Sequence, residues 1–196
     1  MDERRRLVLA STSAYRRALL KRLWPAFECA APEVDESPQP GESPAQTAQR
    51  LACAKAGAVA PRFADALIIG SDQVASLGAM RLEKPGTHAN ALRQLQALSG
   101  RTARFDTAVC VLDSARAAQW LRVVPCQVTF RRLEARTIEA YLRREQPYDC
   151  AGSAKAEGLG IALIERIDTE DPTALIGLPL IALTELLAAA GQPVIA

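Results

Sequence analysis

The feature that most constrains the fold is an apolar run that ends in a short polar tetrapeptide. Residues 66–69 read Ala-Leu-Ile-Ile, a pattern typical of a buried strand, and Gly70-Ser71-Asp72-Gln73 follows directly. In an open α/β sheet, ligands bind at the carboxyl ends of the strands. The segment therefore predicts a strand that brings the carboxylate of Asp72 and the amide of Gln73 to a ligand-binding edge.

A second segment near the N-terminus has the same form. The apolar residues 7–10 lead into Ser11-Thr12-Ser13-Ala14-Tyr15-Arg16-Arg17, which places hydroxyl groups and guanidinium groups at the expected start of a helix. Hydroxyls, guanidinium groups and a helix N-terminus together suit an anionic ligand, phosphate above all. We expect this second strand end to bind phosphate.

The rest of the chain alternates strand and helix signals through its first half. The patterns predict helices over 14–23, 44–60, 136–144 and 179–190, with one more between the cap Thr87 and Gly100. They predict further strands over 27–30, 102–112, 119–130 and 160–164, the middle two forming an antiparallel hairpin. The expected fold is α/β: one domain over 1–196 with a two-lobed mixed β-sheet, flanking helices and loops gathered over a groove.

Composition excludes several classes of protein. With 196 residues, 49% apolar and 23% charged, and a net charge of +2, the chain is typical of a globular protein that binds no nucleic-acid polymer. No apolar window reaches membrane-spanning length, and the five cysteines lack metal or redox spacing, so we expect a cytoplasmic protein with reduced, mostly buried thiols. A single histidine, His88, argues against a Ser-His-Asp triad or a zinc-hydrolase cluster.

Charged residues at the ends of the expected elements are the candidates for binding. The acidic segment 33–36 could join Asp72 in holding a divalent cation such as Mg²⁺, and otherwise is a solvated loop. Asp72 could instead cap a local turn, although an unpaired buried carboxylate is costly. Lys55 and Lys84 would neutralise phosphate, or else be ordinary surface lysines. The small-residue segment 149–160 matches neither a P-loop nor a dinucleotide fingerprint.

Taken in order, these motifs resemble those of one family, the Maf family of nucleoside triphosphate pyrophosphatases, which is related in fold to inosine triphosphatases. The resemblance runs essentially end to end. The matching segments are Leu9 to Arg17, Ala30 to Glu36, Gly70-Ser71-Asp72-Gln73, Ala151-Gly152-Ser153 and Gly177-Leu178-Pro179-Leu180. Tyr15, Gln73 and Glu157 match the branch that acts on 7-methyl-GTP, the YceF-like subfamily.

The resemblance implies a reaction and a role for each candidate. Asp72 would be the proton acceptor that activates water for attack on the α-phosphorus, releasing pyrophosphate and 7-methyl-GMP and so removing a modified nucleotide from the pool. A divalent metal, Mg²⁺ or Mn²⁺, would bridge the phosphates and be held by Glu33 and Asp72. The remaining implied roles are triphosphate binding by Ser11, Arg16, Lys55 and Lys84, and base selection by Tyr15, Gln73 and Glu157.

Alternatives remain open within this resemblance. The sister branch acts on dTTP and UTP, and the family has been linked to septum formation, so a non-catalytic nucleotide-binding regulator is a second alternative. The presence of Asp72 favours an enzyme. Glu83 stands before Lys84-Pro85 where the family commonly has glycine, which adds a negative charge beside Lys84. The expected partner is a small-molecule nucleoside triphosphate, and the family makes a homodimer plausible.

Overall fold

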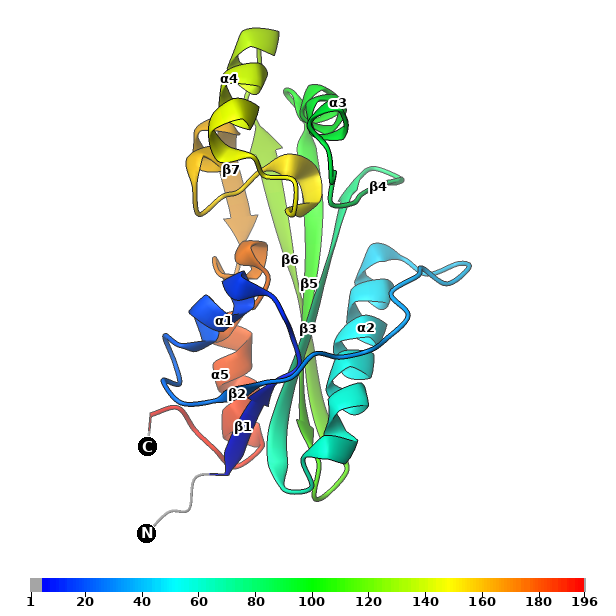
Figure 1. Ribbon diagram of the computed structural model, residues 1–196, viewed down its shortest axis with the longest axis vertical. Coiled ribbons are helices and arrows are strands. Elements are labelled where there is room, and N and C mark those ends of the chain that lie inside the picture. The colour runs from blue at the N-terminus through cyan, green and yellow to red at the C-terminus, as the bar shows by residue number, and fades with distance from the viewer. Residues whose placement is uncertain (1–4, 196) are drawn as a thin grey trace. The chain divides into compact units, whose positions relative to one another are not determined.

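The computed structural model describes residues 5–195, which fold as two compact units. Within that range the first unit comprises 5–73, 107–124 and 171–195, and the second comprises 74–106 and 125–170. Seven strands form one sheet in the order β2-β1-β3-β5-β6-β7, with β4 beside β3 (Figure 1). The strands are β1 (Arg6–Leu9), β2 (Glu28–Cys29), β3 (Ala66–Leu77), β4 (Met80–Leu82), β5 (Thr102–Asp113), β6 (Ala118–Phe130) and β7 (Ile164–Thr169).

The sheet is mixed, as the sequence predicted. β1 pairs in parallel with both β2 and β3, whereas β4 is antiparallel to β3 and β7 is antiparallel to β6. Helices flank it. The α-helices are α1 (Ala14–Leu20), α2 (Pro44–Val59), α3 (His88–Leu98), α4 (Ala135–Glu145) and α5 (Leu180–Ala189). Among the residues described, no helix is both long enough and apolar enough to cross a membrane.

In the first unit, helices cover both faces of β3 (Figure 1). Leu67 and Ile69 belong to an apolar core with side chains of β1, α1 and α5. The alternate residue Gly70 faces α2, where a Cβ atom would lie 2.1 Å from the carbonyl oxygen of Ala52. Because β3 is buried on both faces, its residues form a continuous apolar run rather than an alternating one.

Hydroxyl side chains cap the start of three helices, and the first of these, expected over 14–23, ends already at Leu20. The Ser43 hydroxyl accepts from the backbone N–H of Gln46, whose side chain accepts from the backbone N–H of Ser43, so a capping box begins α2. Ser13 and Thr87 cap α1 and α3 with their hydroxyls alone, which accept from the backbone N–H groups of Arg16 and Asn90. Gly100 follows α3 with a φ of 67°, the left-handed conformation that glycine adopts easily.

Two predicted strand boundaries are wrong. Residues 160–164 were expected as a strand, but η3, a 3-10 helix over Leu159–Leu163, occupies this stretch and β7 begins at Ile164. The reason is a tight turn: a Cβ atom at Gly160 would lie 2.5 Å from the backbone of Lys155. The other error is the end of β3, which runs through Gly70-Ser71-Asp72-Gln73 to Leu77 instead of stopping at Ile69.

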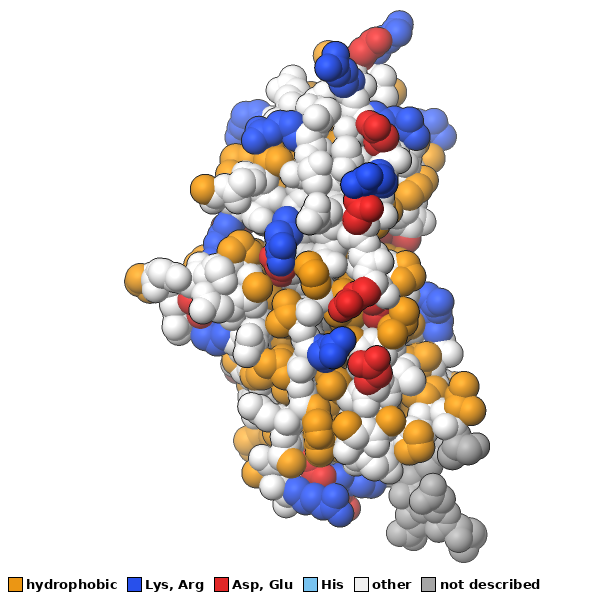
Figure 2. All heavy atoms as spheres, turned by 180° about the vertical axis from the view of Figure 1, so that it is seen from behind, with side chains coloured by type: hydrophobic (Ala, Val, Ile, Leu, Met, Phe, Trp, Pro, Cys, Tyr) orange, Lys and Arg blue, Asp and Glu red, His pale blue; other side chains and the backbone are white. Residues whose placement is uncertain are grey.

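The surface charge agrees with the composition, whereas the burial of the cysteines agrees with expectation only in part. On the face drawn in Figure 2, basic and acidic side chains lie interspersed, in keeping with the small net charge of +2. All five cysteines are free thiols, but only Cys110 and Cys126 are buried. Cys29 is exposed, so the expectation of mostly buried thiols is wrong for that residue.

Candidate active site

Asp72 and Lys55, two residues singled out separately in the sequence, form a buried ion pair in the first unit. The Nζ of Lys55 lies 2.7 Å from Oδ1 of Asp72, and both residues are close to fully buried, with exposed fractions of 5% and 6%. The same Nζ lies 2.7 Å from Oε1 of Glu36, whose side chain is largely exposed. One ammonium group therefore joins two carboxylates.

The local sequence explains how this pair forms. Even-numbered residues of β3 face α2, so Gly70 and Asp72 point to the same helix. Gly70 lets the helix backbone approach the strand closely, and Lys55 then extends along the buried face of α2 to reach the carboxylate. Lys55 is thus not the solvated surface lysine that an Ala-rich helix would ordinarily carry.

Burial sets the electrostatics of this pair. Loss of solvent raises the pKa of Asp72 above its ordinary value of 3.8, against the opposing effects of Lys55 and Arg16. Burial likewise lowers the pKa of Arg16, while the nearby charges of Asp72 and Glu36 act in the other direction. A carboxylate that burial makes more basic, held beside two cations, can accept a proton near an anionic ligand.

The N-terminal segment places Arg16 beside the same strand. The Nε of Arg16 donates to the carbonyl oxygen of Gly177 at 2.8 Å, and the Ser71 hydroxyl lies 2.9 Å from that oxygen. Gly177 has a φ of 113°, a conformation that favours glycine. Its carbonyl oxygen accepts from both Arg16 on α1 and Ser71 on β3. Ser11 is buried, and its hydroxyl accepts from the backbone N–H of Ser13 at 3.1 Å.

Gln73 faces the opposite side of β3 from Asp72. Its Nε2 lies 2.9 Å from the Thr107 hydroxyl, 2.9 Å from the carbonyl oxygen of Ala174 and 3.1 Å from that of Leu175. Thr107 is fully buried on β5. Sequence patterns gave no signal for Thr107, because a threonine inside a β-strand is typical of a strand rather than a site.

A buried aspartate fixes the segment that supplies these carbonyls. Asp171 accepts from the backbone N–H and the hydroxyl of Thr173, at 3.0 and 2.7 Å, and from the backbone N–H of Ile181 at 2.7 Å. It thereby ties the segment 171–179 to the first turn of α5 and satisfies N–H groups that have no partner within the helix. The sequence gives no signal for this role, because an aspartate in a loop is ordinary and its partners on α5 lie up to eleven residues away.

The other predicted site residues have varied surroundings. Tyr15 lies half-buried on α1. Glu33 is exposed in the segment between β2 and α2, and in the part of the chain that the structure describes it is Glu36 that contacts Lys55. In the second unit, Lys84 is exposed in the loop between β4 and α3, and Glu157 is exposed in the turn before η3.

Asp72 and Glu36 are the carboxylates near Lys55 that a divalent cation could use. Within residues 5–195 no group of three or more His, Cys, Asp and Glu side chains could hold a metal ion by itself. Mg²⁺, however, commonly uses one or two protein carboxylates and completes its shell with phosphate and water. Asp72 and Glu36 already hold one cationic group between them, the Lys55 ammonium, so their oxygens surround a position that favours positive charge.

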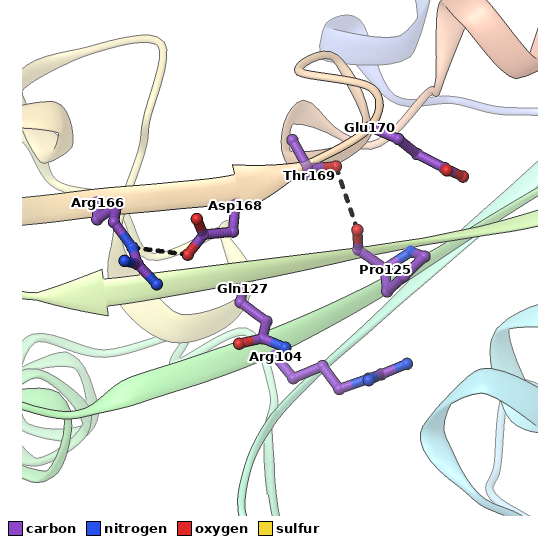
Figure 3. Close-up of a pocket in the computed structure, with 7 residues that line it drawn as sticks. All are labelled: Arg104, Pro125, Gln127, Arg166, Asp168, Thr169 and Glu170. Carbon is purple, nitrogen blue, oxygen red and sulfur yellow. Dashed lines mark hydrogen bonds and ion pairs between the residues drawn. The ribbon is translucent and has the colours of Figure 1, made fainter.

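A separate cavity of about 390 Å³ lies within the second unit, on β5, β6 and β7 (Figure 3). None of the predicted site residues lines it. Its arginines have carboxylate partners on their own strands: Arg104 donates to Asp106 at 2.8 Å, and Arg166 donates to Asp168 at 2.8 Å. Charge in this cavity is therefore largely balanced within the protein.

The chain is similar in sequence to one protein family and to several named proteins. Residues 6–190 match the family model described as Maf-like protein. A protein of Cupriavidus metallidurans named 7-methyl-GTP pyrophosphatase is 55% identical over 98% of this chain and 96% of its own length. Proteins of the same name from Burkholderia thailandensis and a Polaromonas strain are 56% and 59% identical, over 96% and 95% of this chain and 89% and 85% of their own lengths. Among solved structures, the Staphylococcus aureus Ham1 protein aligns with 64% of this chain and 71% of its own, at a TM-score of 0.45 and 16% identity.

Proposed function

Because this chain belongs to the Maf family, with relatives above 50% identity over nearly its whole length, we propose that it hydrolyses 7-methyl-GTP to 7-methyl-GMP and pyrophosphate. The observation that carries the proposal is the buried pair of Asp72 and Lys55 at 2.7 Å, next to the Arg16 segment. Cleavage of a phosphoanhydride needs an oriented water, a proton acceptor and neutralisation of charge, and these residue types supply all three.

In the proposed reaction Asp72 takes the proton from the water that attacks the α-phosphorus. Burial raises the pKa of its carboxyl group and so makes it more basic than an exposed aspartate, while the charges of Lys55 and Arg16 favour its ionised form. Lys55, Arg16 and Ser11 donate to the triphosphate, and Lys84 is a further candidate. When phosphate oxygens take over the Lys55 ammonium, the Asp72 oxygen it occupied becomes available to water.

A divalent cation, Mg²⁺ or Mn²⁺, belongs to this proposal. Asp72, with Glu36 or Glu33, would hold it together with the phosphates. Bound there, it would neutralise charge on the phosphates and on the departing pyrophosphate. Tyr15, Gln73 and Glu157 would select the base: a methylated guanine carries positive charge, which favours stacking on an aromatic ring and a nearby carboxylate.

The test is pyrophosphate release by the purified full-length chain with Mg²⁺ or Mn²⁺, comparing 7-methyl-GTP, GTP, dTTP and UTP. We expect selective turnover of 7-methyl-GTP that requires the metal and falls at least 100-fold in Asp72→Asn, the order of magnitude for loss of a general base. Asp65→Asn is the matched control, because Asp65 is an exposed aspartate of the same unit, with 76% of its side chain accessible. Preference for dTTP or UTP would overturn the substrate, and full activity of a folded Asp72→Asn would overturn the mechanism.

A further inference from the structure

The Thr107 hydroxyl lies between Gln73 and the segment 171–179, in a fully buried position. Its Oγ1 donates to the carbonyl oxygen of Ala174 at 2.9 Å, and the Nε2 of Gln73 lies 2.9 Å from the same Oγ1. All these residues belong to the first unit. Thr107 therefore connects Gln73 on β3 to the segment 171–179 by hydrogen bonds.

Counting donors decides which way the Gln73 amide points. A hydroxyl has a single hydrogen, and Thr107 gives it to Ala174, so only a lone pair remains for Gln73. The other two groups around Nε2, the carbonyl oxygens of Ala174 and Leu175, can only accept. The amide nitrogen must then face this pocket, because an amide oxygen in its place would lie 2.9 and 3.1 Å from two carbonyl oxygens and be repelled by them.

The amide oxygen of Gln73 consequently points elsewhere. Within the described part of the chain, it has no hydrogen-bond donor from the protein, and no buried side-chain nitrogen or oxygen is left without a partner. Oε1 therefore reaches solvent, and the side chain as a whole is only half-buried. The group that Gln73 can offer to a ligand is a hydrogen-bond acceptor.

We propose that Thr107 is a positioning residue for base selection: together with the carbonyl groups of Ala174 and Leu175 it holds the Gln73 amide so that its oxygen, not its nitrogen, faces the base. This inference rests on the proposed function, in which Gln73 contacts the nucleotide base. An acceptor at this position favours a base edge that presents N–H donors, as guanine does with its ring N–H and its amino group. A reversed amide would favour an edge that presents carbonyl oxygens.

The first test compares kcat/KM for 7-methyl-GTP and for UTP in the wild type, Thr107→Val and Thr107→Ser. Valine keeps the shape but removes one of the three acceptors and sets a methyl group against the amide, leaving only the two carbonyls of one loop to hold it. We therefore expect the 7-methyl-GTP to UTP ratio to fall about tenfold, the effect of one misplaced neutral hydrogen bond. Serine keeps the hydroxyl and should hold the ratio within about twofold of wild type. A merely structural role would lower turnover of both substrates equally, and an unchanged ratio in a folded Thr107→Val protein overturns the proposal.

A second readout needs no activity. The side-chain amide protons of Gln73, identified in an ¹⁵N spectrum by their disappearance in Gln73→Glu, should exchange slowly in wild type and Thr107→Ser and faster in Thr107→Val. Exchange in wild type as fast as for an exposed glutamine such as Gln39 would overturn the proposed amide orientation. If the wild type hydrolyses none of the nucleotides, the proposed function fails, and this measurement still decides the role of Thr107.

Discussion

Gly70 is the position where a single methyl group should disturb the proposed active site most. In Gly70→Ala the new Cβ would lie 2.1 Å from the carbonyl oxygen of Ala52 and 2.8 Å from the backbone nitrogen of Ala56. Real Cβ contacts below 3.0 Å are essentially absent, so α2 must move away from β3 by about 1 Å. The obstacle is helix backbone, which cannot rotate aside as a side chain would.

Two effects follow from this displacement. Overpacking of this kind costs about 1–3 kcal/mol, which a urea unfolding curve measures as a lower midpoint at unchanged slope. Because α2 carries Lys55, the 2.7 Å contact with Asp72 is disturbed as well. A shift of about 1 Å in a reacting group can cost roughly 100-fold in rate, so pyrophosphate release should fall by about that factor.

Gly57→Ala is the matched control on the same helix. A Cβ at Gly57 meets nothing within 4 Å, and alanine is the better helix former by about 1 kcal/mol, so this variant should be slightly more stable and fully active. The reasoning would be refuted if Gly70→Ala unfolded at the wild-type midpoint and retained turnover within twofold, since the close approach of α2 would then have no consequence.

Two further predictions concern pH. Burial raises the pKa of Asp72, so kcat/KM should be lost on acidification with a midpoint above the ordinary 3.8; a midpoint at or below that value contradicts the assignment of Asp72 as the base. The ion pair with Arg5 lowers the pKa of Asp113 from 3.8 to about 2, so its stabilisation of about 2 kcal/mol is present above pH 4 and is lost as pH falls toward 2. Asp113→Asn should accordingly lower the unfolding free energy at pH 7 but have little effect at pH 2, and an equal loss at both pH values would argue against the ion pair as the cause.

Much of the fold could be predicted because local signals agree with the tertiary structure. Thr87 and Gly100 bound a helix as expected, and the apolar runs form the predicted strands of a mixed sheet. These signals act within a few residues, so they are readable from the chain alone. The turn at Gly160 could not be predicted in this way, because it depends on a close approach to the backbone of Lys155.

The sequence named the candidate residues of the buried ion pair but not the contact between them. Asp72 and Lys55 could each be named, yet their direct contact depends on how closely α2 approaches β3. The acidic segment 33–36 gave no means of choosing between Glu33 and Glu36, because a loop has no side-chain period. The structure brings Glu36 to Lys55.

β3 continues past its predicted end at Ile69, and this continuation explains how the proposed site is held in place. A buried strand normally ends at a polar tetrapeptide, because polar side chains inside the sheet would lose their hydrogen bonds to water. Here hydrogen bonds and an ion pair within the protein replace those bonds. The Ser71 hydroxyl reaches the carbonyls of Ala108 and Gly177, Asp72 binds Lys55, and Gln73 donates to Thr107. Each polar group thus stays on a continuous strand rather than in a loop, and regular elements hold side chains more precisely than loops do. The partners that carry the strand past Ile69 therefore give Asp72 and Gln73 fixed positions on opposite faces of one strand, so that their proposed roles, proton transfer and base selection, depend on separate contacts.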